Sequence, residues 1–460
     1  MKKSRATKAS SSKAAQLLAS QGASTGVTDV FAAFASPVGS PGSSNYAAGF
    51  GTALGVTADS EFSVLLKKLT KKEAVTRAKA VEELRDLLVT RSSQPDCIDT
   101  LSAALPAFVR SYRTQLLDDS RAVREGLHVC LGVFVKTLKK EVQPQLKQLL
   151  PVWLCGAFDQ EPATAAAART ALQEAFPNGK VQAAVAFCAA EIAAEIRTLL
   201  SHDELSLEEE FSGRRGEVDV TERERRYDRA VSAALGAFAE SVTILTSSAP
   251  SKLSEFTALL PPTARRGTVW GCLGGTARLG VRSTALEALA KSCTALRAVE
   301  GVEGLDELRE SPKAPLLLIL NALGEKDRIL LDRVGEALLA FTGLVPASWQ
   351  AVALDKAMWP RLSSAVAGGL SAPLQATVPR ILAAIPEEEA QRKGPTLLST
   401  VLDFVASSLL PPSAEQVGVY WESCVVLHER GVELPAATLG RPVEVLVPSR
   451  KATAALRLAA

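Results

Sequence analysis

The residues of this chain that could do covalent or metal chemistry are few and scattered. The seven cysteines are Cys97, Cys130, Cys155, Cys188, Cys272, Cys293 and Cys424. The closest two are 21 residues apart, so no pair has the C-x-x-C spacing of a zinc finger, a ribbon or a RING. Their odd number and apolar surroundings fit reduced, buried thiols of an intracellular protein. His128, His202 and His428 are 74 and 226 residues apart, so no two histidines have metal-ligand spacing. We therefore expect no metal and no cofactor in this chain.

Three short motifs that could support catalysis lack the context that catalysis needs. Residues 22–26 match G-x-S-x-G but lie in a low-complexity segment instead of a strand-to-helix turn. The acids at 208–210 lie in an apparent linker, where general acid chemistry lacks desolvated, oriented groups. Gly179-Lys180 lacks the preceding glycine of a phosphate loop. We expect no catalytic residue.

A basic cluster is the best candidate for binding. Its members are Lys67, Lys68, Lys71, Lys72, Arg77 and Lys79. Such a cluster could contact RNA phosphates with a strong dependence on salt, although charge runs commonly just face solvent. A second, weaker patch contains Lys136, Lys139, Lys140 and Lys147. The net charge of only +2 does not favour a dedicated nucleic-acid binder, and we expect no DNA partner.

The elements that must position these residues are helices. Hydrophobic residues make up 47% of the chain and aromatics only 5%, a composition that favours helices over sheets. Apolar residues recur at helical spacing over 73–90, 119–138 and 181–200, and strand-like alternation is essentially absent. Such helices recur with a loose period of about 40 residues, which is typical of HEAT repeats. The sequence predicts an all-α, HEAT/armadillo-like helical repeat solenoid with a disordered N-terminal tail.

One motif supports the repeat interpretation. Asp119-x-x-x-Val123-Arg124 resembles the start of a second HEAT helix, in which the Asp and the Arg tie successive repeats together. An ordinary amphipathic helix is the alternative.

The chain divides into five predicted segments. They are a disordered, basic, low-complexity tail with a short helix (1–58), a HEAT domain (59–200), a charged linker (201–220), further HEAT-like repeats (221–448) and a tail (449–460). The basic, acid-poor start also fits an organelle transit peptide. No apolar run approaches the ~20 residues that a membrane span needs, so we expect no membrane partner.

The first 200 residues carry an ordered series of short motifs. They are the run 12–18 (SKAAQLL), Gly49-Phe50-Gly51, the runs 59–62, 66–72 and 76–80, Leu105-Pro106, Val123-Arg124, Pro151-x-Trp153 and Ala175-Phe176-Pro177. In order and spacing, this series resembles the N-terminal domain of listerin, the RING-type E3 ubiquitin ligase of ribosome-associated quality control. The resemblance covers residues 12 to about 200, and beyond that the chain shares only a helical-repeat character with the family's long arm.

The resemblance implies a function and partners. In the family, this domain docks on the large ribosomal subunit and on a partner that senses the peptidyl-tRNA. The RING, which binds zinc and the ubiquitin-conjugating enzyme, lies at the C-terminus of much longer proteins. Residues 59–200 would be the docking head of a cytosolic protein, and this chain alone would be inactive in ubiquitin transfer. A truncated gene model and a stand-alone module both remain open, as does a generic HEAT-repeat adaptor unrelated to ribosomes.

Overall fold

The computed structural model describes residues 60–211, 219–262, 266–325, 327–367, 372–407 and 414–434. All of them belong to one of the two units of the chain, Ala58–Ala460. The predicted tails at 1–58 and 449–460, with the short helix and the Gly49-Phe50-Gly51 motif, lie outside the described residues.

The described chain is built from helices, and its described ranges contain no strand. The first helices are α3 (Ser60–Leu69), α4 (Ala74–Ser92), α5 (Cys97–Gln115), α6 (Arg121–Leu138), the 3-10 helix η2 (Lys139–Gln145), α7 (Leu146–Gly156), α8 (Pro162–Ala175), α9 (Lys180–Phe187), α10 (Ala189–Ser201) and α11 (Glu204–Phe211). The later helices are α12 (Val220–Ser248), η3 (Pro250–Lys252), α13 (Ser254–Thr257), η4 (Val269–Leu273), α14 (Leu279–Arg297), α15 (Asp306–Glu310), α16 (Lys313–Leu323), α17 (Arg328–Leu344), η5 (Pro346–Ala351), α18 (Leu354–Ala357), α19 (Trp359–Ala367), α20 (Ala372–Ala384), α21 (Glu387–Ser407) and α22 (Ala414–Glu429).

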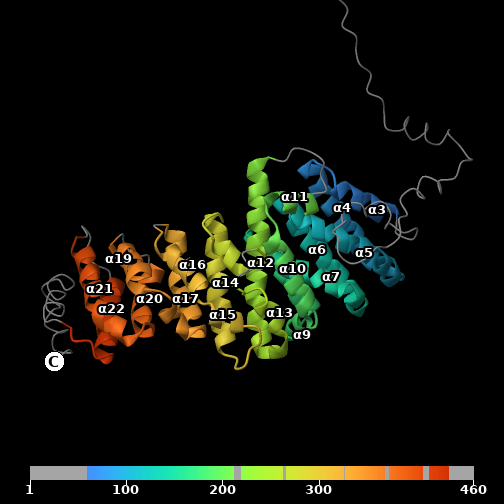
Figure 1. The fold of residues 1–460 in the computed structure, drawn as a ribbon. Helices are drawn as coiled ribbons and strands as arrows, with labels where there is room; N and C mark the ends of the chain where they lie inside the picture. Colours follow the sequence, from blue (N-terminus) through green and yellow to red (C-terminus); the bar gives the residue numbers. More distant parts are fainter. Residues whose placement is uncertain are drawn as a thin grey trace, which may run out of the picture. The chain divides into compact units, whose positions relative to one another are not determined.

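These helices stack as antiparallel pairs in two rows (Figure 1). One row runs from α3 through α5, α7 and α10 and, by way of η4, to α16, α19 and α21. In the second row α4, α6 and α8 pack in sequence, and so do α12, α14, α17, α20 and α22. Each pair can bury its broad apolar faces only against its neighbours, as in a repeat array. The predicted all-α helical repeat fold is confirmed.

Helix α6 shows how the sequence pattern becomes packing. Its apolar stripe at 123, 127, 130, 131, 134 and 138 is entirely buried. Phe134 stacks against Phe108 of α5 with ring centroids 4.7 Å apart, and it meets the ring of Phe62 of α3 edge-on at 5.9 Å. Three helices therefore share one aromatic core, which fixes the first two pairs against each other.

Helix α12 is the longest described helix, and it connects the first helix pairs to the later ones. It packs against α7, α9 and α10 on one side and against α14 on the other. Among the described helices, only α12 is long and apolar enough to cross a membrane by length and composition. However, 61% of its most apolar window is buried inside the protein, which is the pattern of a core helix.

Two local predictions differ from the structure. The helix predicted over 181–200 is two helices, α9 and α10, because the backbone leaves helical geometry at Cys188 (φ −103°, ψ 17°). The buried face continues across this break, so periodicity does not reveal it. The predicted linker 201–220 begins with helix α11. Its first turn is capped by Asp203, which accepts from the backbone N–H of Ser206 at 2.9 Å, and its Leu207 is buried.

The turns of the first three pairs lie on two opposite edges of the stack. The turns within a pair lie at 70–73, 116–120 and 157–161. They share one edge, because the start of α4 contacts the turn before α6, and the start of α6 contacts the turn before α8. Connections between pairs, such as η2, follow the other ends of these helices. Helix α6 alone separates the two edges by about 27 Å, given its rise of about 1.5 Å per residue.

Candidate docking surface

The basic cluster predicted from the sequence lies around the turn between α3 and α4. Helix α3 ends at Leu69, where the backbone N–H and the hydroxyl of Thr70 both donate to the carbonyl of Lys67. The side chains of Lys67, Lys71 and Lys72 are exposed, and no described carboxylate pairs with them. The turn therefore presents three ammonium groups to solvent.

Arg77 does not belong to this surface, and its predicted contact with a partner is wrong. Its side chain is fully buried and donates from Nε and Nη2 to the two carboxylate oxygens of Asp118, at 2.5 and 2.8 Å. Nη2 also donates to Asp119 at 2.8 Å. The sequence could not show this, because the partner carboxylates lie more than 40 residues away.

Arg77 instead positions the lysines. Its Nη1 donates to the backbone carbonyls of Lys71 and Lys72, at 3.0 and 2.6 Å. One buried guanidinium thus ties the α3–α4 turn to the α5–α6 turn. Charge-assisted, bidentate pairs are the strong ones among protein hydrogen bonds. The two lysines therefore project from a fixed backbone.

Two further members of the predicted cluster lie along the helices. Lys68 pairs with Glu83 of α4 at 2.6 Å, and this hydrogen bond lowers the pKa of the Glu83 carboxyl. Lys68 is therefore partly neutralised within the chain. Lys79 is exposed one half-turn beyond Arg77, and Val75, which is 81% exposed, lies between Arg77 and the turn. Val75 is not among the residues predicted from the sequence, although a valine beside lysines at the start of a helix was an available signal.

The predicted stacking residues form a ladder of charges between neighbouring pairs. Val123 is buried, and Arg124 donates to the two oxygens of Asp159 at 2.8 and 3.2 Å. Its Nη1 also donates to the carbonyl of Asp118 at 2.6 Å. Asp119 accepts from Arg77, so the carboxylate and the arginine of the motif face opposite neighbours.

The same device returns later in the chain, where the sequence analysis did not identify it. Arg282, the fourth residue of α14, pairs with Glu325 ahead of α17. Arg77 and Arg124 are likewise the fourth residues of α4 and α6. The dipeptide Val281-Arg282 repeats Val123-Arg124 and was the available signal.

The second lysine patch lies on the opposite edge of the stack. Lys139 and Lys140 are exposed in η2, after the end of α6. Lys147 pairs with Glu191 at 2.6 Å, and its Nζ lies 5.3 Å from the ring centroid of Phe187, which is 55% exposed. Because the two patches face opposite edges, a single flat partner cannot cover both.

The buried polar residues are arranged for packing. The Nδ1 of His128 lies 2.8 Å from the hydroxyl of Tyr112, and burial lowers the pKa of His128 to about 4. Burial likewise raises the pKa of Cys130 and of Cys293 to about 12, so both thiols stay protonated and unreactive. Among the described residues, no three or more His, Cys, Asp or Glu side chains are grouped so that they could hold a metal ion.

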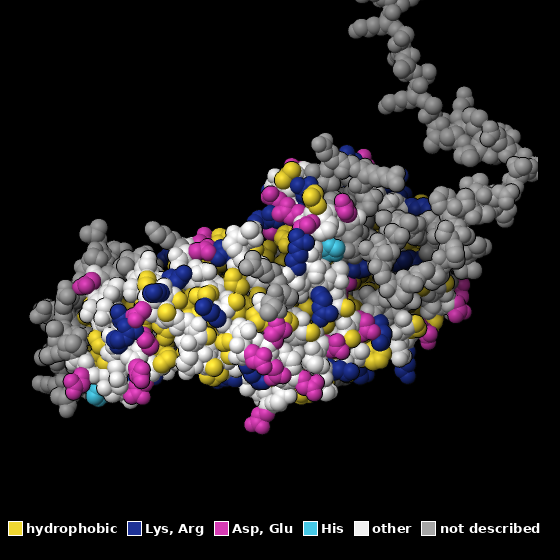
Figure 2. All heavy atoms as spheres, in the orientation of Figure 1, with side chains coloured by type: hydrophobic (Ala, Val, Ile, Leu, Met, Phe, Trp, Pro, Cys, Tyr) yellow, Lys and Arg dark blue, Asp and Glu magenta, His cyan; other side chains and the backbone are white. Residues whose placement is uncertain are grey.

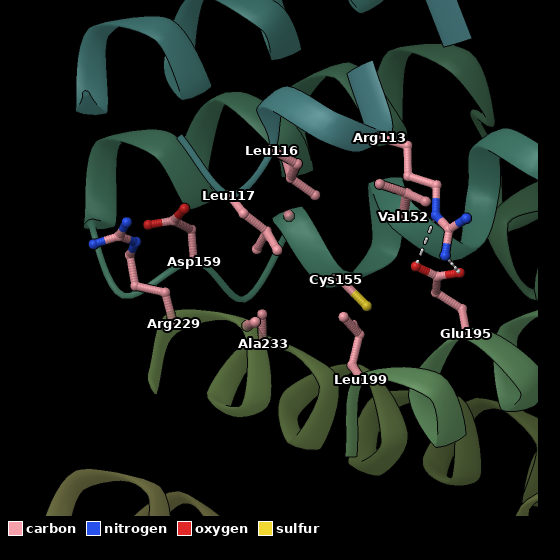
Figure 3. A pocket seen from close by; sticks show the side chains of 12 residues that line it. Arg113, Leu116, Leu117, Val152, Cys155, Asp159, Glu195, Leu199, Arg229 and Ala233 are labelled. Atoms are coloured by element: carbon pink, nitrogen blue, oxygen red, sulfur yellow. Dashed lines mark hydrogen bonds and ion pairs between the residues drawn. The ribbon is translucent and has the colours of Figure 1, made fainter. Parts of the chain in front are cut away.

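A small cavity of about 30 Å³ lies where α5, α7, α10 and α12 meet (Figure 3). The Arg113–Glu195 ion pair closes one end at 3.0 Å, and Asp159 and Arg229 line the other. Leu116, Cys155, Leu199 and Ala233 are among the residues around its middle. That volume holds about one water molecule, so it is a packing defect and has no room for a ligand.

Taken together, these observations define an all-helical repeat protein. The sequence profile of the E3 ubiquitin-protein ligase listerin N-terminal domain matches residues 57–385. The chain belongs to the listerin family. The match continues well beyond residue 200, where the motifs quoted from the sequence ended, so the family's repeats include α12 to α20.

Curated relatives agree with this assignment. The chain is 26% identical to the listerin of Mus musculus over 313 residues, which are 68% of this chain and 16% of that protein. It is 25% identical to the listerin of Gallus gallus over 306 residues, or 66% and 16% of the two chains. The chain thus spans about a sixth of the length of the curated relatives it matches.

Solved structures show only remote similarity. A designed armadillo repeat protein is 15% identical with a TM-score of 0.24, over 60% of this chain and 98% of that one. Kap121p is 11% identical with a TM-score of 0.25, over 84% and 46% of the two chains. The fold class therefore rests on the helix pairing described above.

Proposed function

We propose that this chain is the non-catalytic docking and scaffold part of a listerin-type E3 ubiquitin ligase. In this proposal it acts in the cytosol and binds the large ribosomal subunit during quality control of stalled nascent chains. The peptidyl-tRNA-sensing partner is its second contact, and the zinc and the ubiquitin-conjugating enzyme belong to the RING of the family. Membership of the listerin family supports the assignment to a ligase.

The observation that carries the docking step is the α3–α4 turn. Lys67, Lys71 and Lys72 are exposed there and have no described carboxylate partner, while the buried guanidinium of Arg77 fixes the backbone of Lys71 and Lys72. A preordered cluster loses less conformational entropy on binding than three flexible lysines would. Ribosomal RNA offers closely spaced phosphates, and each neutralised phosphate releases counterions.

Co-sedimentation with salt-washed large ribosomal subunits tests the proposal. We expect the purified chain to pellet with the subunits at about 50 mM salt and to dissociate as salt rises toward about 200 mM. The triple reversal K67E/K71E/K72E should weaken binding by at least about tenfold and flatten the salt dependence.

The matched control is K136E/K139E/K140E, which makes the same change in charge on the opposite edge. We expect this variant to bind nearly as the unchanged chain does. Equal losses in both variants would show non-specific attraction between net charges. A chain that stays in the supernatant at low salt would contradict ribosome docking and favour the generic adaptor.

A further inference from the structure

Asp118, in the turn between α5 and α6, is the residue on which three arginines from three helices converge. It is 2% exposed, and its carboxylate is held by Arg77 of α4. Its backbone carbonyl accepts from Nη1 of Arg124 of α6 at 2.6 Å and from Nη2 of Arg229 of α12 at 3.4 Å. Arg229 lies 111 positions further along the chain, so long-range contact at this turn joins α12 to the first helix pairs.

The carboxylate of Asp118 also fixes the α3–α4 turn (70–73), the lysine turn, at both of its ends. Arg77, bound to this carboxylate, donates to two backbone carbonyls of the lysine turn. The side-chain amide of Gln115, with its nitrogen turned toward these acceptors, donates to Asp118 Oδ2 at 3.0 Å and to the carbonyl of Leu69 at 3.2 Å. Leu69 ends α3, so two donors that share one carboxylate hold the chain before and within the lysine turn.

Arg229 holds the α5–α6 turn against the start of α12. Its side chain is 12% exposed and pairs with Glu222, two turns earlier in α12, at 3.1 Å. Burial and the neighbouring Arg124 lower the pKa of its guanidinium, and Asp159 lies beside it at one end of the small cavity (Figure 3). A desolvated cation next to a second cation is stable only while its acceptors stay in place. Arg229 therefore resists movement of α12 away from the α5–α6 turn.

We propose that Arg229 and Asp118 are positioning residues of the lysine turn. Arg229 seats the α5–α6 turn on α12, and Asp118 passes that position to the lysine turn through Arg77 and Gln115. This inference rests on the proposed docking function and adds a dependence to it. Docking at the lysine turn is coupled to how α12, the helix that connects the first pairs to the later ones, lies against residue 118.

Hydrogen exchange of the full chain tests this link without any ribosome. The reporters are the backbone N–H groups of Thr70 and Lys71, which donate back to the last turn of α3 at 3.3 and 3.1 Å. Mass spectrometry of a peptide that spans 67–76 follows them. We expect Arg229→Gln to accelerate their exchange by about fivefold, and Arg229→Lys, which keeps the charge, by less than about twofold.

Two further variants check the path and its specificity. Asp118→Asn removes the charge that holds Arg77 and should accelerate the same exchange by at least about tenfold. Arg278→Gln is the matched control, because Arg278, just ahead of α14, pairs with Asp228 of α12 at 2.8 Å. It disturbs the start of α12 without removing a contact to Asp118, and it should change exchange in the lysine turn by less than about twofold.

Co-sedimentation with large ribosomal subunits at about 0.1 M salt gives the functional readout. Arg229→Gln should weaken binding by about threefold although every exposed lysine is kept, because a less ordered turn loses more conformational entropy on binding. Arg278→Gln makes the same change in net charge and should bind as the unchanged chain does. The slope of affinity against salt should stay the same in both variants, since the same number of phosphates is neutralised.

The proposal is overturned if Arg229→Gln leaves exchange in the lysine turn unchanged, or if Arg278→Gln accelerates it equally. Normal subunit binding by a variant with fast exchange would also overturn it, because order in the turn would then not matter for docking. Failure of the proposed function looks different, since even the unchanged chain would stay in the supernatant. Exchange would in that case still decide whether Arg229 orders the lysine turn.

Discussion

The first helix pairs and the later helices α17 and α20 are held together by different interactions. Between α4, α6 and the α7–α8 turn, buried arginines meet buried carboxylates, as in Arg77–Asp118 and Arg124–Asp159. Between α17 and α20 the ion pair is Arg380–Glu336, with both side chains about half exposed. There the two helices approach each other closely, because Gly335 lies directly against Thr377.

The two kinds of ion pair differ in what they hold in place. A buried charge pair is costly to desolvate, and it is weak evidence for stability on its own. It does fix geometry, and Arg77 fixes the lysine turn through two backbone carbonyls. The Arg380–Glu336 pair, by contrast, is exposed, and Figure 2 shows mixed charges over the surface of the later helices.

The largest expected effect is the loss of the first arginine of the ladder. Arg77→Ala leaves Asp118 buried without its main partner and should lower the free energy of unfolding by about 3 to 5 kcal/mol. Urea denaturation followed by circular dichroism measures this. If the loss were no greater than that of Arg380→Ala, the buried and the exposed ion pair would contribute equally to stability. That result would contradict the difference between the two regions.

Disturbing the packing between α17 and α20 should lower the free energy of unfolding by less than the loss of Arg77 does. Gly335→Ala places a Cβ 2.2 Å from the Thr377 hydroxyl oxygen and should cost about 1 to 3 kcal/mol. Gly418→Ala in α22 is the control, because nothing lies within 4 Å of its added Cβ. That change should raise stability by roughly 0.5 to 1 kcal/mol, and thermal unfolding of both variants compares them.

The first region should also be sensitive to acid through His128. Its pKa is about 4 in the folded chain and near 6.5 when unfolded, so the unfolded state binds the proton first as pH falls. This stability is intact above about pH 6.5 and is lost progressively down to about pH 4. Between pH 6.5 and 5 we expect a loss of roughly 2 kcal/mol. Unfolding measured across this range in His128→Gln should show a flatter profile, and an unchanged slope would exclude His128 as the cause.

The smallest effect is expected at the exposed pair. Arg380→Ala should change the free energy of unfolding by less than about 1 kcal/mol, since exposed ion pairs are screened and lose side-chain entropy. The change should shrink further at about 1 M salt. A loss as large as that of Arg77→Ala would mean that the later pairs depend on charge as the first ones do.

Local periodicity was sufficient to predict most of the helices. The stripe of α6 and the absence of strand-like alternation identified the all-α repeat class, because a face that is apolar every three or four residues has to be buried by a neighbour. The order of short motifs, read as a whole, identified the family. The two local errors, at Cys188 and in α11, came where a break or a cap leaves the apolar pattern unchanged.

The sequence by itself determined the helices, their amphipathic faces and the place of the lysines on one turn. Only the tertiary structure decided which of the basic residues face solvent. Arg77 and Lys71 are both basic and six positions apart, yet Arg77 is buried because Asp118 arrives from a turn 41 residues away. Burial is set by neighbours that are distant in the chain, and a local pattern carries no information about them.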